Sequence, residues 1–347
     1  MTNGRLSILL LTVFLSWTGC SDDEGVIDIP ADKAALTFHV TTRASENSED
    51  VAITDRQFGH LLLAERKPEH SPIGGDERLH CDPAHRYDLE GSQFQIDSLL
   101  GQWYKFAFVC LPALPDTEMG KGMLIAEGNG ATYDTEHDFN KLMVNYMSAL
   151  TYQENNLEEA QSEDLAIYRK VIDSWVDAVN PTSENVALTR VTGELVMDMG
   201  IPSDQFNTKE KGNVTAIEIA LSQPWLYLYI HDEANDEVIT SRGVSTYRFV
   251  WNVDAGAQDT RQRFRVALLP GALDNGDTKA TVTVSFENGE PEEFVLNNED
   301  SEAIEIKKNT RTTVLFNGMH TDEFEVRYAG FDDRAFIDVA DDGWYGW

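Results

Sequence analysis

Positive charge is scarce in this chain. Its 347 residues hold 27 Lys and Arg against 60 Asp and Glu, a formal net charge of −33 at pH 7. A nucleic-acid-binding protein needs a positively charged footprint, so the charge argues strongly against that class. It also argues against docking on anionic lipid without a covalent anchor. The balance suits a protein that stays soluble outside the cell, and a hydrophobic share of 41% still permits a packed core.

Catalytic motifs are missing as well. The sequence contains no GxSxG, no HExxH, no P-loop and no GxGxxG that opens a helix after a strand. A glycosidase would need two placed carboxylates in a cleft, a condition that 60 acidic residues leave untestable from sequence. We therefore expect no enzyme activity and no cofactor. A structural or binding role is favoured over a secreted hydrolase.

Metal-ligand patterns are weak. His80, Cys81 and His85 lie close together with His70 upstream, a set that zinc could take. The spacing fits no standard zinc finger, and a solvated turn explains it as simply. We expect no metal site here. The aspartate pairs near the C-terminus also lack the alternating acidic pattern of a calcium loop: these are Asp332–Asp333 and Asp341–Asp342.

The N-terminus has the form of an export signal. Residues 1–5 carry one side-chain charge, residues 6–15 are almost wholly apolar but too short to span a bilayer comfortably, and small residues precede Cys20. The pattern resembles a bacterial lipoprotein signal, in which Cys20 becomes the lipidated N-terminus; a plain secretory signal is the alternative. The apolar block has no periodic polar face, so a buried helix is a poor interpretation.

The acidic stretch "SDDE" that follows Cys20 has two compatible interpretations. It resembles the export signal of Bacteroidetes surface lipoproteins, and it also reads as a solvated linker. Removal of residues 1–19 would leave 328 residues (347 − 19) with a net charge of −34 (26 − 60). We expect a lipoprotein exposed on the outer membrane.

Cysteine is rare, with three in the chain. If Cys20 carries lipid, Cys81 and Cys110 remain. An even pair in an oxidising compartment invites a disulfide, which would need Cα atoms within about 7 Å of each other. The alternative is that both are small core residues.

The pattern along the chain predicts a mainly β protein. Strand-like runs cover 35–43, 58–66, 92–99 and 104–112, with a loop-rich stretch at 66–91. Apolar residues at helical spacing predict a helical insert over 137–150 and 162–181, the second with Leu165, Tyr168, Val171, Ile172 and Trp175 as its buried stripe.

From about residue 189 the pattern changes to short alternating strands separated by Gly, Pro, Asn and Asp turns, which predicts an antiparallel sandwich. "TAIEIALS", "YRFVWNV" and "TVTVSF" alternate most clearly, and "FENGEP" holds an Asn-Gly suited to a hairpin turn. We therefore divide the chain into a signal peptide (1–19), an acidic linker (20–34), two domains (35–186 and 187–330) and a C-terminal tail (331–347).

Three segments carry a family resemblance. "TGCSDDE" and "LTFHVTTRA", with the weaker "NTRTTVLFNG", stand in a chain laid out as a lipoprotein signal, a short strand and two β domains. This layout resembles the fimbrillin superfamily of Bacteroidales, in particular FimB-type fimbrial subunits and related tip and minor pilins. The resemblance implies two transthyretin-like β-sandwich domains.

The resemblance also implies a mechanism of assembly. In polymerising members a trypsin-like protease cuts after an Arg beyond the first strand, that strand leaves, and a neighbouring subunit donates a strand to the groove. Arg43–Ala44 matches the expected cut, and the polar residues after it favour an accessible tip. Alternatively, Arg43 is only a strand-end charge and the strand stays, as expected for an anchor subunit.

The tail "FDDRAFIDVADDGWYGW" offers few alternating apolar residues for a donor strand, which favours a tip, anchor or accessory subunit. Its Trp344, Tyr345 and Trp347 could dock on a partner or cover a patch of the same chain. The expected partners are other fimbrial subunits and a host or bacterial surface receptor. The competing class is a surface glycan-binding lipoprotein, which the core-like positions of Trp175, Trp225 and Trp251 weaken.

Overall fold

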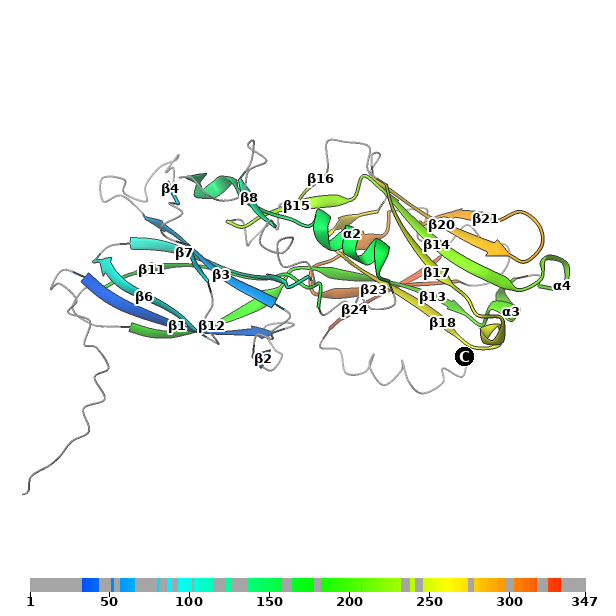
Figure 1. Cartoon of the computed structure of the whole chain (residues 1–347), viewed down its shortest axis with the longest axis horizontal. Coiled ribbons are helices and arrows are strands. Elements are labelled where there is room, and N and C mark those ends of the chain that lie inside the picture. Colours follow the sequence, from blue (N-terminus) through cyan, green and yellow to red (C-terminus); the bar gives the residue numbers. More distant parts are fainter. Residues whose placement is uncertain are drawn as a thin grey trace, which may run out of the picture.

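The computed structural model describes these residue ranges: 33–43, 51–52, 57–65, 80–81, 86–88, 93–101, 103–114, 123–126, 137–157, 164–177, 182–206, 208–231, 238–240, 246–273, 278–297, 303–316 and 324–331. They form an elongated, mainly β molecule with two lobes (Figure 1). None of the helices in these ranges is long and apolar enough to cross a membrane.

The N-terminal lobe is a wrapped sheet in the order β2-β1-β12-β11-β7-β3-β4-β9, with β6 paired to β1 and β5 paired to β3. Its strands confirm the four runs expected between 35 and 112. The bounds are β1 (Lys33–Arg43), β2 (Val51–Ala52), β3 (Gln57–Glu65), β4 (His80–Cys81), β5 (Arg86–Asp88), β6 (Gln93–Leu100), β7 (Trp103–Pro112), β9 (His137–Asp138), β11 (Tyr168–Trp175) and β12 (Thr182–Arg190).

The C-terminal lobe contains two four-stranded sheets, and the core lies between them. The first sheet runs β18 (Gln262–Leu268), β13 (Gly193–Gly200), β23 (Thr310–Leu315), β24 (Glu325–Gly330). The second runs β17 (Thr246–Asn252), β14 (Val214–Ser222), β20 (Lys279–Phe286), β21 (Glu292–Val295). The short strands β19 (Gly271–Ala272) and β22 (Glu305–Ile306) pair beside them.

The alternation expected in this lobe is confirmed. Ile217, Ile219 and Leu221 are fully buried on β14, and Val282 and Val284 are fully buried on β20. The neighbouring positions on these strands are more exposed, so each strand presents one face to the core.

A smaller sheet, β16-β15-β10-β8, joins residues from both halves of the chain: β8 (Leu124–Ala126), β10 (Leu142–Asn145), β15 (Trp225–Tyr229) and β16 (Val238–Thr240). Buried polar contacts reinforce it. The Tyr146 hydroxyl donates to the Leu165 carbonyl at 3.0 Å, and the buried Arg169 donates from Nη1 to the Tyr229 carbonyl at 2.5 Å. One hydrophobic core therefore runs from β7 into the C-terminal lobe.

The predicted helical insert is only partly correct. Residues 137–150 contain β9, a 3-10 turn η2 (Phe139–Lys141), β10 and the start of helix α2 (Met147–Asn155), whereas 162–181 contains β11 and no helix in its described part. Tyr168 and Ile172 pack on one core and Val171 packs on the other. Because both faces of β11 meet apolar residues, its pattern has no period of two and imitates a helical stripe. The remaining short helices are α3 (Pro202–Gln205), α4 (Thr208–Lys211) and the 3-10 turn η3 (Ala255–Ala257).

The first strand of each lobe has the same pairing. β1 runs parallel to β12 and antiparallel to β6, while β13 runs parallel to β23 and antiparallel to β18. β12 spans the expected domain boundary at 186/187 and leads through Val191 and Thr192 into β13. In both lobes, an interior strand is the first to appear in the sequence.

Helix α2 protects two strand edges of the C-terminal lobe. The Gln153 side chain donates from Nε2 to the Ala267 carbonyl at 3.0 Å and accepts from the Ala267 N–H at 2.8 Å, which completes the outer edge of β18. Glu154 accepts from the backbone N–H of Arg248 on β17 at 2.9 Å. Unpaired strand edges invite pairing with other chains, and these side chains occupy them.

The contact between Gln153 and Ala267 yields a stability prediction. Gln153→Ala should lower the free energy of unfolding by about 2–4 kcal/mol, because it leaves two buried backbone groups unpaired. Urea unfolding followed by circular dichroism measures the change. Asn155→Ala on the same helix is the control, since that exposed side chain donates a hydrogen bond to the Thr151 carbonyl within its own helix. Equal urea midpoints for the two variants would contradict the role given to Gln153.

Candidate functional site

The first strand, β1, is held on both edges. It pairs in parallel with β12 from Leu36 opposite Thr182 to Arg43 opposite Thr189. On its other edge it pairs with β6 over Lys33–His39 and with β2 at Thr41 and Thr42. β1 is therefore an interior strand, although it comes first in the described chain.

The side chains of β1 alternate between core and surroundings. Ala34, Leu36, Phe38 and Val40 are at most 5% exposed, whereas His39 is exposed. The Phe38 ring lies 5.1 Å from Phe106 and 5.0 Å from Phe108, measured between ring centroids. This aromatic cluster is the centre of the N-terminal core.

Burial of β1 supplies a large part of the stability of this lobe. A fully buried Leu, Phe or Val side chain contributes about 1.5–3 kcal/mol, so Leu36, Phe38 and Val40 together contribute about 5–9 kcal/mol. A whole domain is stable by only about 5–15 kcal/mol. Loss of β1 would therefore leave an apolar groove that needs another strand.

The walls of that groove come from β6, β7 and β12. Phe94, Ile96 and Leu99 lie on β6, Phe106 and Phe108 on β7, and Val186 and Leu188 on β12. The sequence predicts β6 and β7 but misses β12 as the parallel neighbour of β1. The alternating Val186 and Leu188 in "ENVALTR" are the signal that could have located it.

Arg43 is the last residue of β1, and its backbone is paired with Thr189. Ala44, the other side of the expected cut, lies outside the described residues, as does Cys20. Thr41 and Thr42 are paired on both edges. A protease that binds an extended substrate must therefore detach the end of β1 before it can cut after Arg43.

Of the two alternatives for the cysteines, a disulfide between Cys81 and Cys110 or small core residues, the structure shows no disulfide at Cys110. Cys110 is a free, buried thiol. Its backbone lies opposite Gly59 on β3, whereas β4 pairs on the other edge of β3 with His80 opposite Glu65. Separation by several residues along β3, at about 3.4 Å each, exceeds the reach of a disulfide. Cys110 is therefore a small core residue, the second of the two alternatives.

The remaining sequence candidates lie only in part within the described residues. His80 and Cys81 form β4, while His70 and His85 lie outside the described residues, as do both aspartate pairs of the tail. Within the described ranges, no group of three His, Cys, Asp or Glu side chains is arranged to hold a metal ion.

The tryptophans divide between core and surface. Trp225 is 8% exposed and confirms the core prediction, and the partly buried Trp251 stacks near Phe264 at 5.0 Å. Trp175 is 55% exposed on β11, so its predicted place in the core is wrong. The prediction failed because it assumed a helix over 162–181, whereas the described part of this range holds strand β11.

Cys110 generates a prediction about pH. Burial raises its pKa from 9.0 to about 12. The unfolded thiol ionises near pH 9 and the folded one does not, so Cys110 lowers the free energy of unfolding as the pH rises between about 9 and 12, and has no effect below that window. The check uses chains without residues 1–20 in a Cys81→Ser background. Unfolding at pH 8 and pH 10 should show a smaller pH effect for an added Cys110→Ala substitution, and rapid thiol labelling of the folded chain at pH 8 would contradict the burial.

Comparison with known proteins gives matches among solved structures only. No family model and no curated protein matches the chain. Among solved structures, a candidate adhesin from Bacteroides thetaiotaomicron covers 85% of this chain and 96% of its own at 8% identity and a TM-score of 0.48. A candidate cell adhesion protein from Bacteroides eggerthii covers 87% and 96% at 13% identity and 0.45.

The tip fimbrial protein Mfa3 from Porphyromonas gingivalis, with a C-terminal truncation, covers 86% of this chain and 98% of its own at 11% identity and a TM-score of 0.39. The chain is similar over most of its length to Bacteroides candidate adhesins and to this tip fimbrial protein, the kind of protein that its sequence resembles.

Proposed function

We propose that the chain is a surface lipoprotein that acts as a fimbrial subunit, at the tip, the anchor or an accessory position, and contributes to cell adhesion. In this proposal lipid on Cys20 attaches it to the outer membrane, and strand exchange at β1 joins it to other subunits. The observation that carries the proposal is the position of β1, an interior strand that comes first among the described residues and ends on an Arg.

The physical chemistry of that position supports strand exchange. Cleavage after Arg43 would separate β1 from the lobe with a single cut. The vacated site would expose unpaired edges of β6 and β12 and the apolar walls around Phe106. A strand from a neighbour would restore both the backbone hydrogen bonds and the burial.

The alternative function, glycan binding, is favoured by one observation. Trp175 is exposed and lies opposite Trp103 in the register of β11 and β7. Exposed aromatic rings serve as stacking platforms for sugars, so Trp175 marks where a glycan would bind if strand exchange fails.

The decisive experiment uses the chain without residues 1–20 and an Arg-specific protease. The expected result is a stable product that begins at Ala44 and then forms oligomers, measured by N-terminal sequencing and size-exclusion chromatography. Arg43→Gln should block both, whereas Arg248→Gln, at an exposed residue of β17, should block neither. A synthetic peptide of residues 33–43 should suppress oligomers, and the same peptide with Ser at positions 36, 38 and 40 should not. Resistance at Arg43 together with monomeric behaviour would exclude strand exchange and leave an anchor or a binder.

Loosening of β1 should accelerate the cut. Phe38→Ala removes the ring between Phe106 and Phe108 and should cost about 3–5 kcal/mol of stability. Because the end of β1 must detach before cleavage, the rate after Arg43 should rise by tenfold or more. His39→Ala, one position along the same strand, removes an exposed side chain and should leave the rate unchanged. Equal rates for the two variants, measured by gel densitometry, would show that detachment of β1 does not limit cleavage.

A further inference from the structure

The outer face of the sheet β18-β13-β23-β24 collects positive charge. Among the described residues, Arg263, Arg265, Arg311 and Arg327 lie on it, and Arg261, just before β18, reaches it through Asp198. These five of the 27 Lys and Arg of the chain are here called the arginine face. Register places Arg263 opposite Asp198, Arg265 opposite Val196, and Arg311 opposite Glu194. The face is therefore continuous across all four strands.

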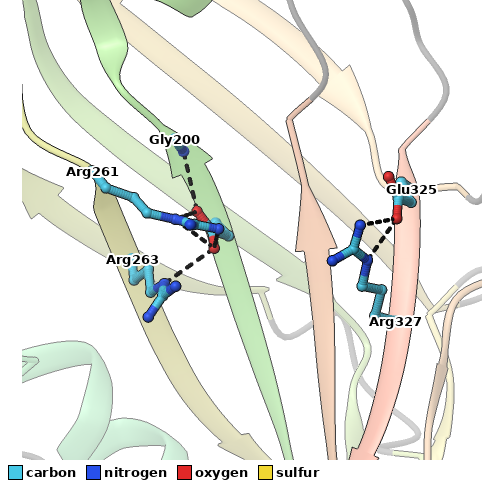
Figure 2. A network of polar contacts seen from close by, with 6 residues as sticks. Gly200, Arg261, Arg263, Glu325 and Arg327 are labelled. Atoms are coloured by element: carbon cyan, nitrogen blue, oxygen red, sulfur yellow. Dashed lines mark hydrogen bonds and ion pairs between the residues drawn. The ribbon is translucent and has the colours of Figure 1, made fainter. Parts of the chain in front are cut away.

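Three acids lie among these arginines. Arg261 donates to Asp198 at 2.8 Å and 2.5 Å, and Arg263 donates to it at 3.1 Å (Figure 2). Glu194 accepts from Arg311 at 2.6 Å, and Glu325 accepts from Arg327 at 2.6 Å. Within the described residues, five arginines against three acids leave a surplus of two positive charges, in a chain whose net charge is −33.

The Asp198 carboxyl is held in its ionised form. Burial alone would raise the pKa of Asp198, but the hydrogen bonds and charge of Arg261, with further hydrogen bonds from the Gly200 N–H and Arg263, hold this pKa below its ordinary value. The Asp198 and Glu194 side chains are only 3% and 1% exposed. They fix the guanidinium groups in place without covering their solvent side.

The arginines themselves reach solvent. The Arg261 side chain is 37% exposed and that of Arg327 is 32% exposed. Arg265 is exposed and has no ion pair within the described residues. A guanidinium carries five N–H donors, more than one carboxylate accepts. The face therefore offers directed donors to an anionic group.

The chain leaves its last strand at this face. Phe331 follows β24 directly, and its ring lies 3.7 Å from the Arg190 guanidinium and 5.3 Å from that of Arg311. The sixteen residues that follow, 332–347, hold five Asp and one Arg, a net charge of −4. Sixteen residues at about 3.3 Å each reach roughly 50 Å, whereas four strands span about 15 Å.

We propose that the arginine face binds the acidic C-terminal segment, residues 332–347, of the same chain. Complementary charge selects the segment, and its attachment at Phe331 supplies a millimolar effective concentration. Its Trp and Tyr rings suit stacking on guanidinium planes, the contact that Phe331 already makes. The proposal goes beyond strand exchange and does not depend on it.

Chemical labelling of arginine tests the proposal in the chain without residues 1–20. Phenylglyoxal modification, followed residue by residue by mass spectrometry, should be several-fold faster at Arg265 in an Asp338→Asn, Asp341→Asn, Asp342→Asn variant than in the unmodified chain. Arg248, 59% exposed on the other sheet, is the internal control and should react equally in both. The matched variant Asp254→Asn, Glu290→Gln, Glu293→Gln changes three exposed acids elsewhere and should leave Arg265 unaffected.

A competing polyanion gives a second readout. A polyglutamate peptide should bind the three-Asn variant about tenfold more tightly than the unmodified chain, because the segment no longer occupies the face. Salt at 0.5 M should speed Arg265 labelling in the unmodified chain and leave the labelling rate of Arg248 unchanged. Equal labelling of Arg265 in all chains, or equal polyglutamate affinity, would overturn the proposal and show that the face is open to other anions.

Discussion

The pairing of β1 between β6 and β12, with Phe38 packed against Phe106 and Phe108, is the interaction on which the N-terminal lobe depends. Both the backbone hydrogen bonds of its neighbours and the centre of the aromatic core require a strand at this place. That strand is nevertheless the first of the described chain, and its C-terminal end leads into the rest of the lobe. A strand on which the lobe depends is thus one that a single cut after Arg43 would release.

The C-terminal lobe was the easier part to predict. Its sheets each have one face on the core, so burial alternates along β14 and β20 and the period of two is visible in the residues. β11 and β7 meet apolar neighbours on both faces, which hides the alternation and produced the false helix at 162–181. β1 and its terminal Arg43 were recognisable in sequence, but the parallel partner β12 was not, because register between distant segments depends on tertiary packing. The free thiol of Cys110 has the same origin, since only the register places Cys81 too far along β3.

Individual side chains cover the strand edges of the C-terminal lobe and order the charges on its first sheet. Gln153 and Glu154 of α2 satisfy backbone groups at the outer edges of β18 and β17, so the side of the sandwich under this helix is closed to further pairing. On the first sheet, buried Glu194 and Asp198 organise arginines into an ordered surface. An acidic chain can therefore present a local positive face without losing its overall repulsion from like-charged surfaces.

The repeated pairing of β1 and β13 bears on the number of connections that one molecule can make. β13 occupies the equivalent interior position in the second lobe, but it is covalently continuous at both ends, with β12 before it and α3 after it. Two cuts would be needed to release it, against one for β1. If β1 is exchanged as proposed, the molecule accepts one donor strand at this site. An assembly built through this site alone would be unbranched.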